Sequence, residues 1–417
     1  METVPTVPLR EFAVHKGLVG GPFGSSLGKR DYVDYGVPVI RGQNLSGSGY
    51  FAGDDFVFVA PEKADSDLAR NLALPGDVVF TQRGTLGQVG IVPPGPYDRY
   101  VISQSQMRLR VDRARTDVRY IYYCFRDPSM LARIQSRAIA TGVPHINLGI
   151  LAELPVPEHP LPVQQAIAEV LGALDDKIAL NERICETSLA LADCYSQAVH
   201  RDGSANPVAT IAQLMADGQL EFGDGYRTKR AEHGQPGLPI LRVAEVADGE
   251  IRPSFADYVR DEFRPAMGRK ISQAGDVVLT TKGTVGRVAL MAADAAEFVY
   301  SPQVCYFRVK PDAQLSNIYL FHWMRGPEFW RQAAGMKGQT DMADYLSLGD
   351  IKSLRITLPS RAVLAEFDRK CAPLHARSAA SRAENRTLAD LRDTLLPQLL
   401  SGKLPVRDAV RSVEEVV

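Results

Sequence analysis

The chain has 417 residues, which is more than one ordinary domain accommodates, because single hydrophobic cores usually stop growing near ~250–300 residues. With 45% apolar and 23% charged residues, the composition is close to the globular average and excludes extensive disorder. The net charge of −1 excludes a protein that holds nucleic acid by bulk positive charge.

The sequence also lacks the features of a membrane protein and of a secreted protein. The longest apolar runs are interrupted within a few residues, far short of the ~20 that a bilayer requires, and the N-terminus lacks the pattern of a signal peptide. We therefore expect a cytoplasmic protein. The five cysteines never form a CxxC pair, so neither a disulfide framework nor a zinc site is expected, and we predict buried thiols.

Short β-branched and aromatic runs, separated by Gly, Pro and Ser, predict strands in the first part of the chain. The runs are 37–40, 56–59, 77–81, 89–92 and 107–111. The segment 120–135, and its later counterpart 317–333, are each expected to form a single helix that packs against a sheet.

Two long helices are predicted from apolar positions that recur every three or four residues, one beginning after Pro162 and one after Pro359. At 1.5 Å per residue each would be about 55 Å long, and one narrow apolar stripe suits antiparallel pairing of the two helices. Polar Asn181, Ser188, Ser378 and Ser381 interrupt the stripes and are expected to fix the register. The predicted seam consists of Ile167, Leu171, Leu174, Ile178, Ile184, Leu191, Leu364, Phe367, Leu374, Leu388, Leu391 and Leu395.

The chain repeats itself after about 200 residues. The 14-residue segment 76–89, GDVVFTQRGTLGQV, is identical to 275–288 at 9 positions without a gap. Upstream, Gly36-Val-Pro-Val-Ile-Arg41 corresponds to Gly237-Leu-Pro-Ile-Leu-Arg242. A period of this length indicates two copies of a whole domain rather than a solenoid.

These elements predict an α+β architecture. Strand-rich domains occupy 1–160 and 204–359, the long helices occupy 161–203 and 360–404, and a tail follows at 405–417. Antiparallel helices would form a coiled coil that acts as a rigid spacer between the domains, related by a pseudo-twofold axis. The central segment 151–200 is acidic, with 2 Lys/Arg against 8 Asp/Glu, so phosphate would be repelled there.

Catalytic and metal-binding patterns are absent from the sequence. The glycine-rich segment 20–28 contains a proline and does not follow the strand-to-helix pattern of a nucleotide site. The seven histidines form no pair at i, i+4, so no helical metal site is expected. We predict no catalytic residue, no metal and no cofactor in this chain.

The repeated segments predict a buried strand, a tight turn and a second strand, with a basic-Gly-Thr tip in each copy. The tips are Arg83-Gly84-Thr85 and Lys282-Gly283-Thr284, where backbone N–H groups, a hydroxyl and a charge could approach a phosphate or base edge. The alternative is that the glycines only make the turn and the cation is solvated.

Forked donors and amides follow one strand in each copy, at Arg41 with Gln43-Asn44 and at Arg242. Such side chains read base edges in the major groove, although a structural ion pair is almost as good an interpretation of the arginines. The full set of predicted DNA-binding residues is Lys29, Arg30, Arg41, Gln43, Asn44, Gln82, Arg83, Thr85, Gln104, Gln106, Arg227, Lys229, Arg230, Arg242, Lys282, Thr284, Lys337 and Gln339.

Taken together, the two copies, the long helices and the Gly-Asp-Val-Val segments resemble the DNA-specificity subunit of type I restriction-modification enzymes. Further family-like stretches are Gly36 to Asn44 and Leu395-Leu-Pro-Gln-Leu-Leu-Ser-Gly-Lys403. The resemblance covers essentially the whole chain. It implies two target-recognition domains, each reading one half of an asymmetric bipartite DNA site, with a non-specific spacer set by the helices.

The resemblance also implies partners. Two modification subunits would carry S-adenosylmethionine-dependent adenine methylation, and restriction subunits would use ATP and Mg for translocation and cleavage. The stretch before Gly237 differs from the one before Gly36, so recognition residues do not transfer between copies. Two other functions are compatible with the sequence: an autonomous restriction or methylation enzyme, and a structural coiled-coil scaffold.

Overall fold

The protein is described here from a computed structural model that covers residues 4–45, 50–51, 55–139, 142–201, 206–252, 254–336 and 345–414. The chain forms two compact units. Unit 1 comprises 1–182 together with 382–417, and unit 2 comprises 183–381. Each unit therefore holds one strand-rich domain and one half of each long helix, which differs from the predicted division into separate domains and helices.

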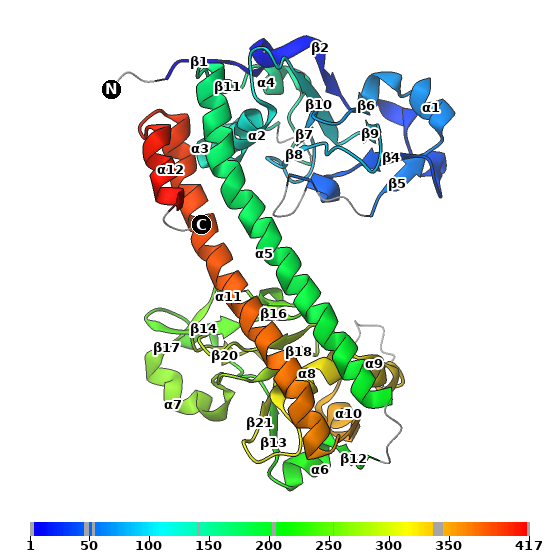
Figure 1. Cartoon of the computed structure of the whole chain (residues 1–417), viewed down its shortest axis with the longest axis vertical. Helices are drawn as coiled ribbons and strands as arrows, with labels where there is room; N and C mark the ends of the chain where they lie inside the picture. The colour runs from blue at the N-terminus through cyan, green and yellow to red at the C-terminus, as the bar shows by residue number, and fades with distance from the viewer. Residues whose placement is uncertain are drawn as a thin grey trace. The chain divides into compact units, whose positions relative to one another are not determined.

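Unit 1 is built on two main sheets (Figure 1). The first is antiparallel in the order β2-β10-β7-β8, and the second has the order β3-β5-β4-β9-β6, with β4 and β9 parallel. A short pair, β1-β11, joins the start of the domain to the residues before the first long helix. The strands are β1 Thr6–Pro8, β2 Ala13–Gly20, β3 Tyr32–Val33, β4 Val37–Ile40, β5 Val57–Val59, β6 Leu72–Ala73, β7 Val78–Thr81, β8 Val89–Ile91, β9 Tyr100–Ile102, β10 Gln106–Val111 and β11 Pro155–Pro157.

Unit 2 repeats this topology strand for strand in its principal sheets. The order β13-β21-β18-β19 matches β2-β10-β7-β8, and β17-β14-β20 matches β5-β4-β9, again with one parallel pair. The internal repeat is thus confirmed in the fold. The strands are β12 Val208–Thr210, β13 Leu220–Asp224, β14 Gly237–Leu241, β15 Val246–Ala247, β16 Glu250–Ile251, β17 Tyr258–Arg260, β18 Val277–Thr280, β19 Val288–Leu290, β20 Val299–Tyr300, β21 Val304–Val309 and β22 Arg355–Thr357.

The run of apolar residues after each repeated Gly-Asp lies between two hydrophobic cores. On β7, Val78 and Phe80 face the core that contains the helices, while Val79 faces the core between the two sheets. On β18, Val277 and Leu279 face one core and Val278 the other. A strand covered on both faces needs apolar residues at successive positions, which explains the Val-Val-Phe and Val-Val-Leu sequences.

The aspartate of each repeat is a buried structural residue. Asp276 Oδ1 and Oδ2 accept hydrogen bonds from Arg308 Nε and Nη2, both at 2.8 Å, and Oδ2 also accepts from the Gln273 amide at 2.8 Å. Asp77 makes the equivalent bonds with Arg110, at 2.9 and 2.8 Å. The carboxylate ties the turn before the strand to an arginine of the adjacent strand, so this part of the motif serves the fold.

The segment 120–135 was predicted to be one helix, and this prediction is wrong, as is the one for 317–333. The structure has α2 and α3 in place of the first, and α8 and α9 in place of the second, with breaks before Pro128 and Pro327. Proline lacks an N–H and forces the preceding residue out of the helical region, while Asp127 caps the new helix by accepting from the Ser129 amide. The shorter helices are α1 Pro61–Asp65, α2 Val118–Arg126, α3 Pro128–Ser136, α4 Leu148–Ala152, α6 Ile211–Ala216, α7 Arg264–Met267, α8 Asn317–Arg325, α9 Pro327–Ala334, α10 Leu348–Ser353 and α12 Val406–Glu414.

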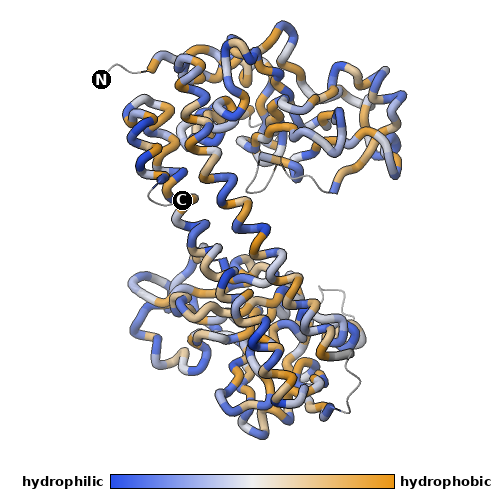
Figure 2. The backbone as a smooth tube through the Cα atoms, in the orientation of Figure 1, coloured by the Kyte–Doolittle hydropathy of each residue, from blue (hydrophilic) through white to orange (hydrophobic). Residues whose placement is uncertain are grey.

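The two long helices are α5, Leu161–Arg201, and α11, Arg361–Leu400, and within each unit their halves pack against each other. In unit 1, Asp175 pairs with Arg392 and Asn181 with Asn385, so the residue numbers run in opposite directions. The pairing is therefore antiparallel there. Figure 2 shows hydrophobic and hydrophilic residues alternating along both helices, as a one-sided apolar stripe requires.

The predicted seam residues are buried or half-buried, except for one. Leu191 is 41% exposed. The fully buried positions on this part of α5 are Ile178, Asn181, Cys185, Ser188, Ala192 and Ser196, which follow the 3.6-residue period of a straight α-helix. The predicted spacing was closer to a coiled-coil repeat, and this difference moves Leu191 out of the interface.

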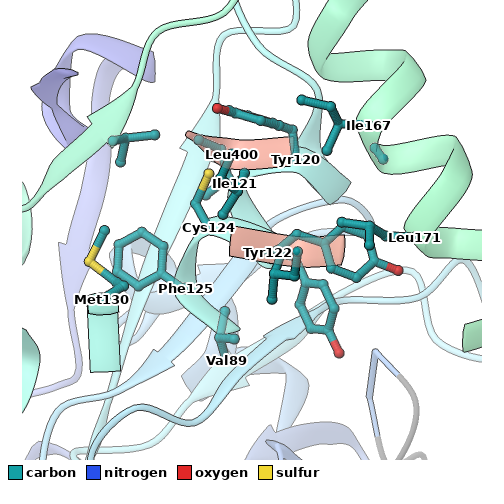
Figure 3. Close-up of a cluster of buried hydrophobic side chains, with 14 of the residues drawn as sticks. Val89, Tyr120, Ile121, Tyr122, Cys124, Phe125, Met130, Ile167, Leu171 and Leu400 are labelled. Atoms are coloured by element: carbon teal, nitrogen blue, oxygen red, sulfur yellow. The ribbon is translucent and has the colours of Figure 1, made fainter. Parts of the chain in front are cut away.

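The helices also complete the core of each domain. In unit 1, Ile167 and Leu171 of α5 lie against Tyr120 and Tyr122 of α2, and Leu400 of α11 joins the same cluster (Figure 3). The predicted tail contains α12, whose Ala409 and Val413 are buried in this core. Its short amphipathic pattern was missed at the sequence level. No helix in the described ranges is both long and apolar enough to cross a membrane.

Replacement of Asp276 by alanine should destabilise unit 2 by about 3–5 kcal/mol, because it leaves the guanidinium of Arg308, which is 8% exposed, without its buried partner. Both tryptophans of the chain, Trp323 and Trp330, lie in unit 2, so urea unfolding followed by tryptophan emission reports on this unit. Asp294→Ala, at an exposed acid of the same unit, is the control. Equal stability of the two variants would contradict a structural role for the motif.

Candidate nucleic-acid interface

The repeated tips lie in the loops that join β7 to β8 and β18 to β19, and their polar side chains are exposed. Arg83, Thr85, Lys282 and Thr284 all face solvent, whereas Gln82 is half-buried. Each tip also pairs through its backbone with a second loop, at Arg83 with His145 and at Lys282 with Tyr345. The basic side chain of each copy, Arg83 or Lys282, therefore lies on a loop that a second loop holds in place.

The glycines of these loops serve the turn. Gly84 and Gly283 have φ of 100° and 80°, and open space surrounds the position that a Cβ atom would occupy. Glycine is therefore required at these positions for its backbone conformation and not because space is lacking. In unit 2, Thr280 Oγ1 donates to the Thr284 carbonyl at 2.6 Å and accepts from the Arg287 amide at 2.9 Å, which closes the loop from beneath.

In unit 1 the tip borders a cavity of about 600 Å³. The structure brings three predicted residues together there, Gln82, Arg83 and Gln104. The segment Gly20 to Gly24 also lines the cavity, and Asn147, Leu148 and Gly149 complete the lining. Arg83 is the one charged residue among these lining residues, and none is acidic, so the cavity suits a ligand with negative charge.

Phe23, on the wall of this cavity, was missed at the sequence level. Its side chain is 90% exposed, although the backbone on both sides is held in place. Asn71 Nδ2 donates to the Gly20 carbonyl at 2.7 Å, and Gln104 Nε2 donates to the carbonyls of Gly24 and Leu27 at 2.6 and 2.7 Å. A large apolar side chain that is exposed to solvent does not stabilise the isolated chain. The Phe23 side chain is therefore suited to contact with a partner.

Gly21 fixes this segment by close backbone packing, and unit 2 contains the same arrangement. A Cβ atom on Gly21 would collide with the Ser103 carbonyl, and one on Gly225 would collide with the Ser301 carbonyl. Both serines begin the equivalent connections β9-β10 and β20-β21. Two residues further on, the first copy has Phe23 and the second has the exposed Arg227.

Arg41 and Arg242 both form ion pairs with an acid located just before the adjacent strand. Arg41 Nη2 lies 3.8 Å from Asp55 Oδ2 and donates to the Asp55 carbonyl at 2.7 Å, while Arg242 Nη2 lies 2.7 Å from Asp257 Oδ2. The structural interpretation of these arginines is thus supported in both copies. A DNA contact would have to use their remaining N–H groups.

The amides near these arginines have largely structural environments. Asn44 is buried and accepts from the Arg41 amide at 2.9 Å, and Gln106 is buried beside Ser103. Gln43 is exposed and donates to the Asp55 carbonyl at 3.1 Å. Of the three, Gln43 is the side chain that a duplex could reach.

The remaining basic candidates lie on a turn that is common to both copies. Gly28 N–H donates to Asp31 at 2.7 Å and Lys229 N–H donates to Glu232 at 3.1 Å, so the turns that carry Lys29-Arg30 and Lys229-Arg230 are closed in the same way. The Gly28 bond also lowers the pKa of Asp31. All four basic side chains are exposed. Lys337 and Gln339 lie outside the described residues.

The thiols offer little nucleophilic chemistry. Burial raises the pKa of Cys305 and of Cys371 to about 12, which keeps both protonated near neutral pH. The expectation that all five cysteines are buried is wrong for Cys194, which is exposed on α5. Within the described ranges, no group of three or more His, Cys, Asp or Glu side chains could hold a metal ion.

Comparison with known proteins gives a consistent result. Residues 25–187 match the family described as the type I restriction modification DNA specificity domain. The MjaIX specificity subunit of Methanocaldococcus jannaschii is 20% identical over 94% of this chain and 92% of its own length. The EcoBI specificity subunit of Escherichia coli is 21% identical over 73% of this chain and 69% of its own.

A solved structure shares the fold. The crystal structure of the type I restriction-modification S subunit from M. genitalium superposes with a TM-score of 0.57 at 15% identity. The match covers 94% of this chain and 95% of that one. The similarity of the two folds therefore extends over nearly the whole chain.

Phe23→Ala should leave the free energy of unfolding unchanged within about 0.5 kcal/mol, because the side chain is almost fully exposed. The same change should weaken binding to duplex DNA about tenfold if Phe23 contacts a base, since an aromatic base contact contributes ~1–3 kcal/mol. The measurement is a titration of the full chain with labelled duplex DNA. The control is Tyr35→Ala, which removes another exposed aromatic side chain of the same domain that does not line the cavity. Equal affinity of the two variants for DNA would contradict a contact between Phe23 and DNA.

Proposed function

We propose that this chain, which belongs to the specificity-subunit family of type I restriction-modification systems, recognises DNA with both domains, each reading one half of a bipartite site. As a DNA-recognition subunit it supplies sequence specificity. Each domain contacts its own half-site, and the exposed loops of that domain make the contacts.

One observation carries the proposal: a single scaffold is built twice and bears different exposed side chains at matching places. The Asp77–Arg110 and Asp276–Arg308 pairs, and the glycines of both tips, are common to the copies. The solvent-facing positions differ, with Phe23 against Arg227 and Arg83 against Lys282. A constant frame with variable contact residues is what two readers of unlike half-sites require.

We further propose that the chain is not itself catalytic. Methylation and cleavage would then be carried out by two modification subunits, which bind S-adenosylmethionine, and by restriction subunits, which use ATP and Mg. The near-neutral net charge supports this dependence on partners, because binding by counterion release scales with the number of phosphates that basic side chains neutralise.

Mapping of methylated adenines in the genome of the host tests the function directly. The expected result is one bipartite motif, with two specified ends and an unspecified spacer, that disappears when this chain is deleted. Methylation that persists without the chain would contradict the proposal. Methyl transfer or cleavage by the purified chain would favour an autonomous enzyme, and binding without any sequence preference would favour a scaffold.

Arg83→Ala and Lys282→Ala should each weaken DNA binding by the assembled complex. If the cation contacts a phosphate, affinity falls by a similar factor on cognate and non-cognate DNA, and the slope of log K against log salt decreases by about 1. If it contacts a base edge, the loss is confined to cognate DNA. Lys403→Ala, at an exposed lysine after α11, is the control, and unchanged affinity and slope in both tip variants would eliminate the tips as contacts.

A further inference from the structure

A chain of three polar side chains connects the second domain to both long helices inside unit 2. His322 of α8 is 1% exposed. Its Nδ1 lies 2.6 Å from Asp193 Oδ1 of α5, and its Nε2 lies 2.9 Å from His375 Nε2 of α11. One buried imidazole thus bridges a carboxylate and a second imidazole.

The contacts determine where the protons lie. A carboxylate accepts only, so Nδ1 of His322 carries the proton that is donated to Asp193. In the neutral ring Nε2 is then an acceptor, and His375 donates to it through its own Nε2–H. While His375 keeps this tautomer, a proton added to Nε2 of His322 places two N–H groups against each other at 2.9 Å, and the bond can re-form only if His375 moves its own proton to Nδ1.

The surroundings favour the ionised state of Asp193. Burial raises the pKa of this carboxyl, but hydrogen bonds from His322 and Arg325 outweigh burial and lower it. Arg325 Nη2 lies 3.0 Å from Asp193 Oδ2, and Arg325 Nη1 lies 2.5 Å from Asp248 of the β15-β16 turn. The rings of Phe321 and Phe367 pack against His322, and Phe321 also contacts His375. A cavity of about 440 Å³, lined in part by Asp193, His322 and Arg325, lies against the cluster.

Unit 1 has a corresponding cluster without histidine. Tyr123, which occupies the place of His322 on the equivalent helix α2, donates to Asp175 Oδ2 of α5 at 2.8 Å. Arg392 of α11 donates to Asp175 Oδ1 at 2.7 Å, and Arg126, the equivalent of Arg325, lies 3.9 Å from Oδ2. Burial raises the pKa of Tyr123, so this phenol stays protonated across the neutral range.

We propose that His322 and His375 are positioning residues that hold the second domain most firmly on the helix pair while Nε2 of His322 is unprotonated. Acidification then loosens unit 2 and leaves the attachment of the first domain in unit 1 intact. Because the proposed function assigns one half-site to each domain, discrimination at the half-site of the second domain weakens selectively in acid.

The expected direction follows from proton linkage. Burial lowers the pKa of His322 from its usual 6.5, and the approach of Arg325 acts in the same direction against the bond to Asp193. The unfolded chain therefore binds more protons than the folded chain at pH values between the lowered pKa and 6.5. Stability contributed by the cluster is complete above this window and declines as the pH falls through it.

The test uses the full chain and its two tryptophans, both of which lie in unit 2 and one of which, Trp323, adjoins His322. Thermal unfolding is followed by tryptophan emission between pH 8 and pH 5.5. We expect the midpoint of the wild-type transition to fall by roughly 2–4 °C over this range. A midpoint that does not change with pH would overturn the proposal.

His322→Tyr, which copies Tyr123, is the decisive variant, because it removes the titrating ring and should give a flat profile. His375→Gln should retain only the part of the pH dependence that burial and Arg325 cause, because its side-chain amide can donate to the neutral imidazole or turn its oxygen toward the protonated one. His233→Gln, at another histidine of unit 2, should keep the wild-type profile. Equal pH dependence in wild type and a folded cluster variant would overturn the proposal, and because no DNA is involved this outcome is independent of the proposed function.

Discussion

Each compact unit depends on apolar packing between a strand-rich domain and halves of both long helices. In unit 1, Ile167 and Leu171 share a core with Tyr120 and Tyr122, and in unit 2, Leu364 and Phe367 share one with Tyr319. The long helices therefore contribute residues to the domain cores and also pack against each other. A domain cannot change its orientation on its helices without opening this core, so the helix contacts fix the orientation of each domain within its unit.

Much of this architecture could be predicted from the sequence because it follows from local periodicity and from the repeat. The five strand runs, the long helices and the duplicated Gly-Asp-Val-Val segments each carry a local signal. The break at Pro128 was missed because the apolar pattern continues across it, and the position of Leu191 was missed because a 3.5-residue and a 3.6-residue stripe differ by only one position over several turns.

The interface was harder to predict, because sequence type does not reveal which polar groups are already engaged. Asn44 and Arg41 have the chemistry of base-reading residues, yet one is buried in a turn and the other pairs with Asp55. Conversely, Phe23 has the chemistry of a core residue and is exposed. Both errors have one origin: burial and hydrogen-bond partners depend on segments distant in sequence, such as Asn71 and Gln104 for the loop that carries Phe23.

The two anchoring clusters show how a duplicated fold can diverge without loss of geometry. In unit 1 the helix that follows the domain supplies the acid, Asp175, and the other helix supplies Arg392. In unit 2 the helix that follows the domain supplies His375, and the acid, Asp193, comes from the other helix. Both arrangements leave the domain's own side chains, Tyr123 or His322 with its neighbouring arginine, bound to a carboxylate of α5. Both acids lie on α5, whereas the groups that α11 supplies differ, because Arg392 binds Asp175 directly and His375 reaches Asp193 only through His322. The carboxylate on one helix was therefore kept in both units, while its connection to the other helix changed.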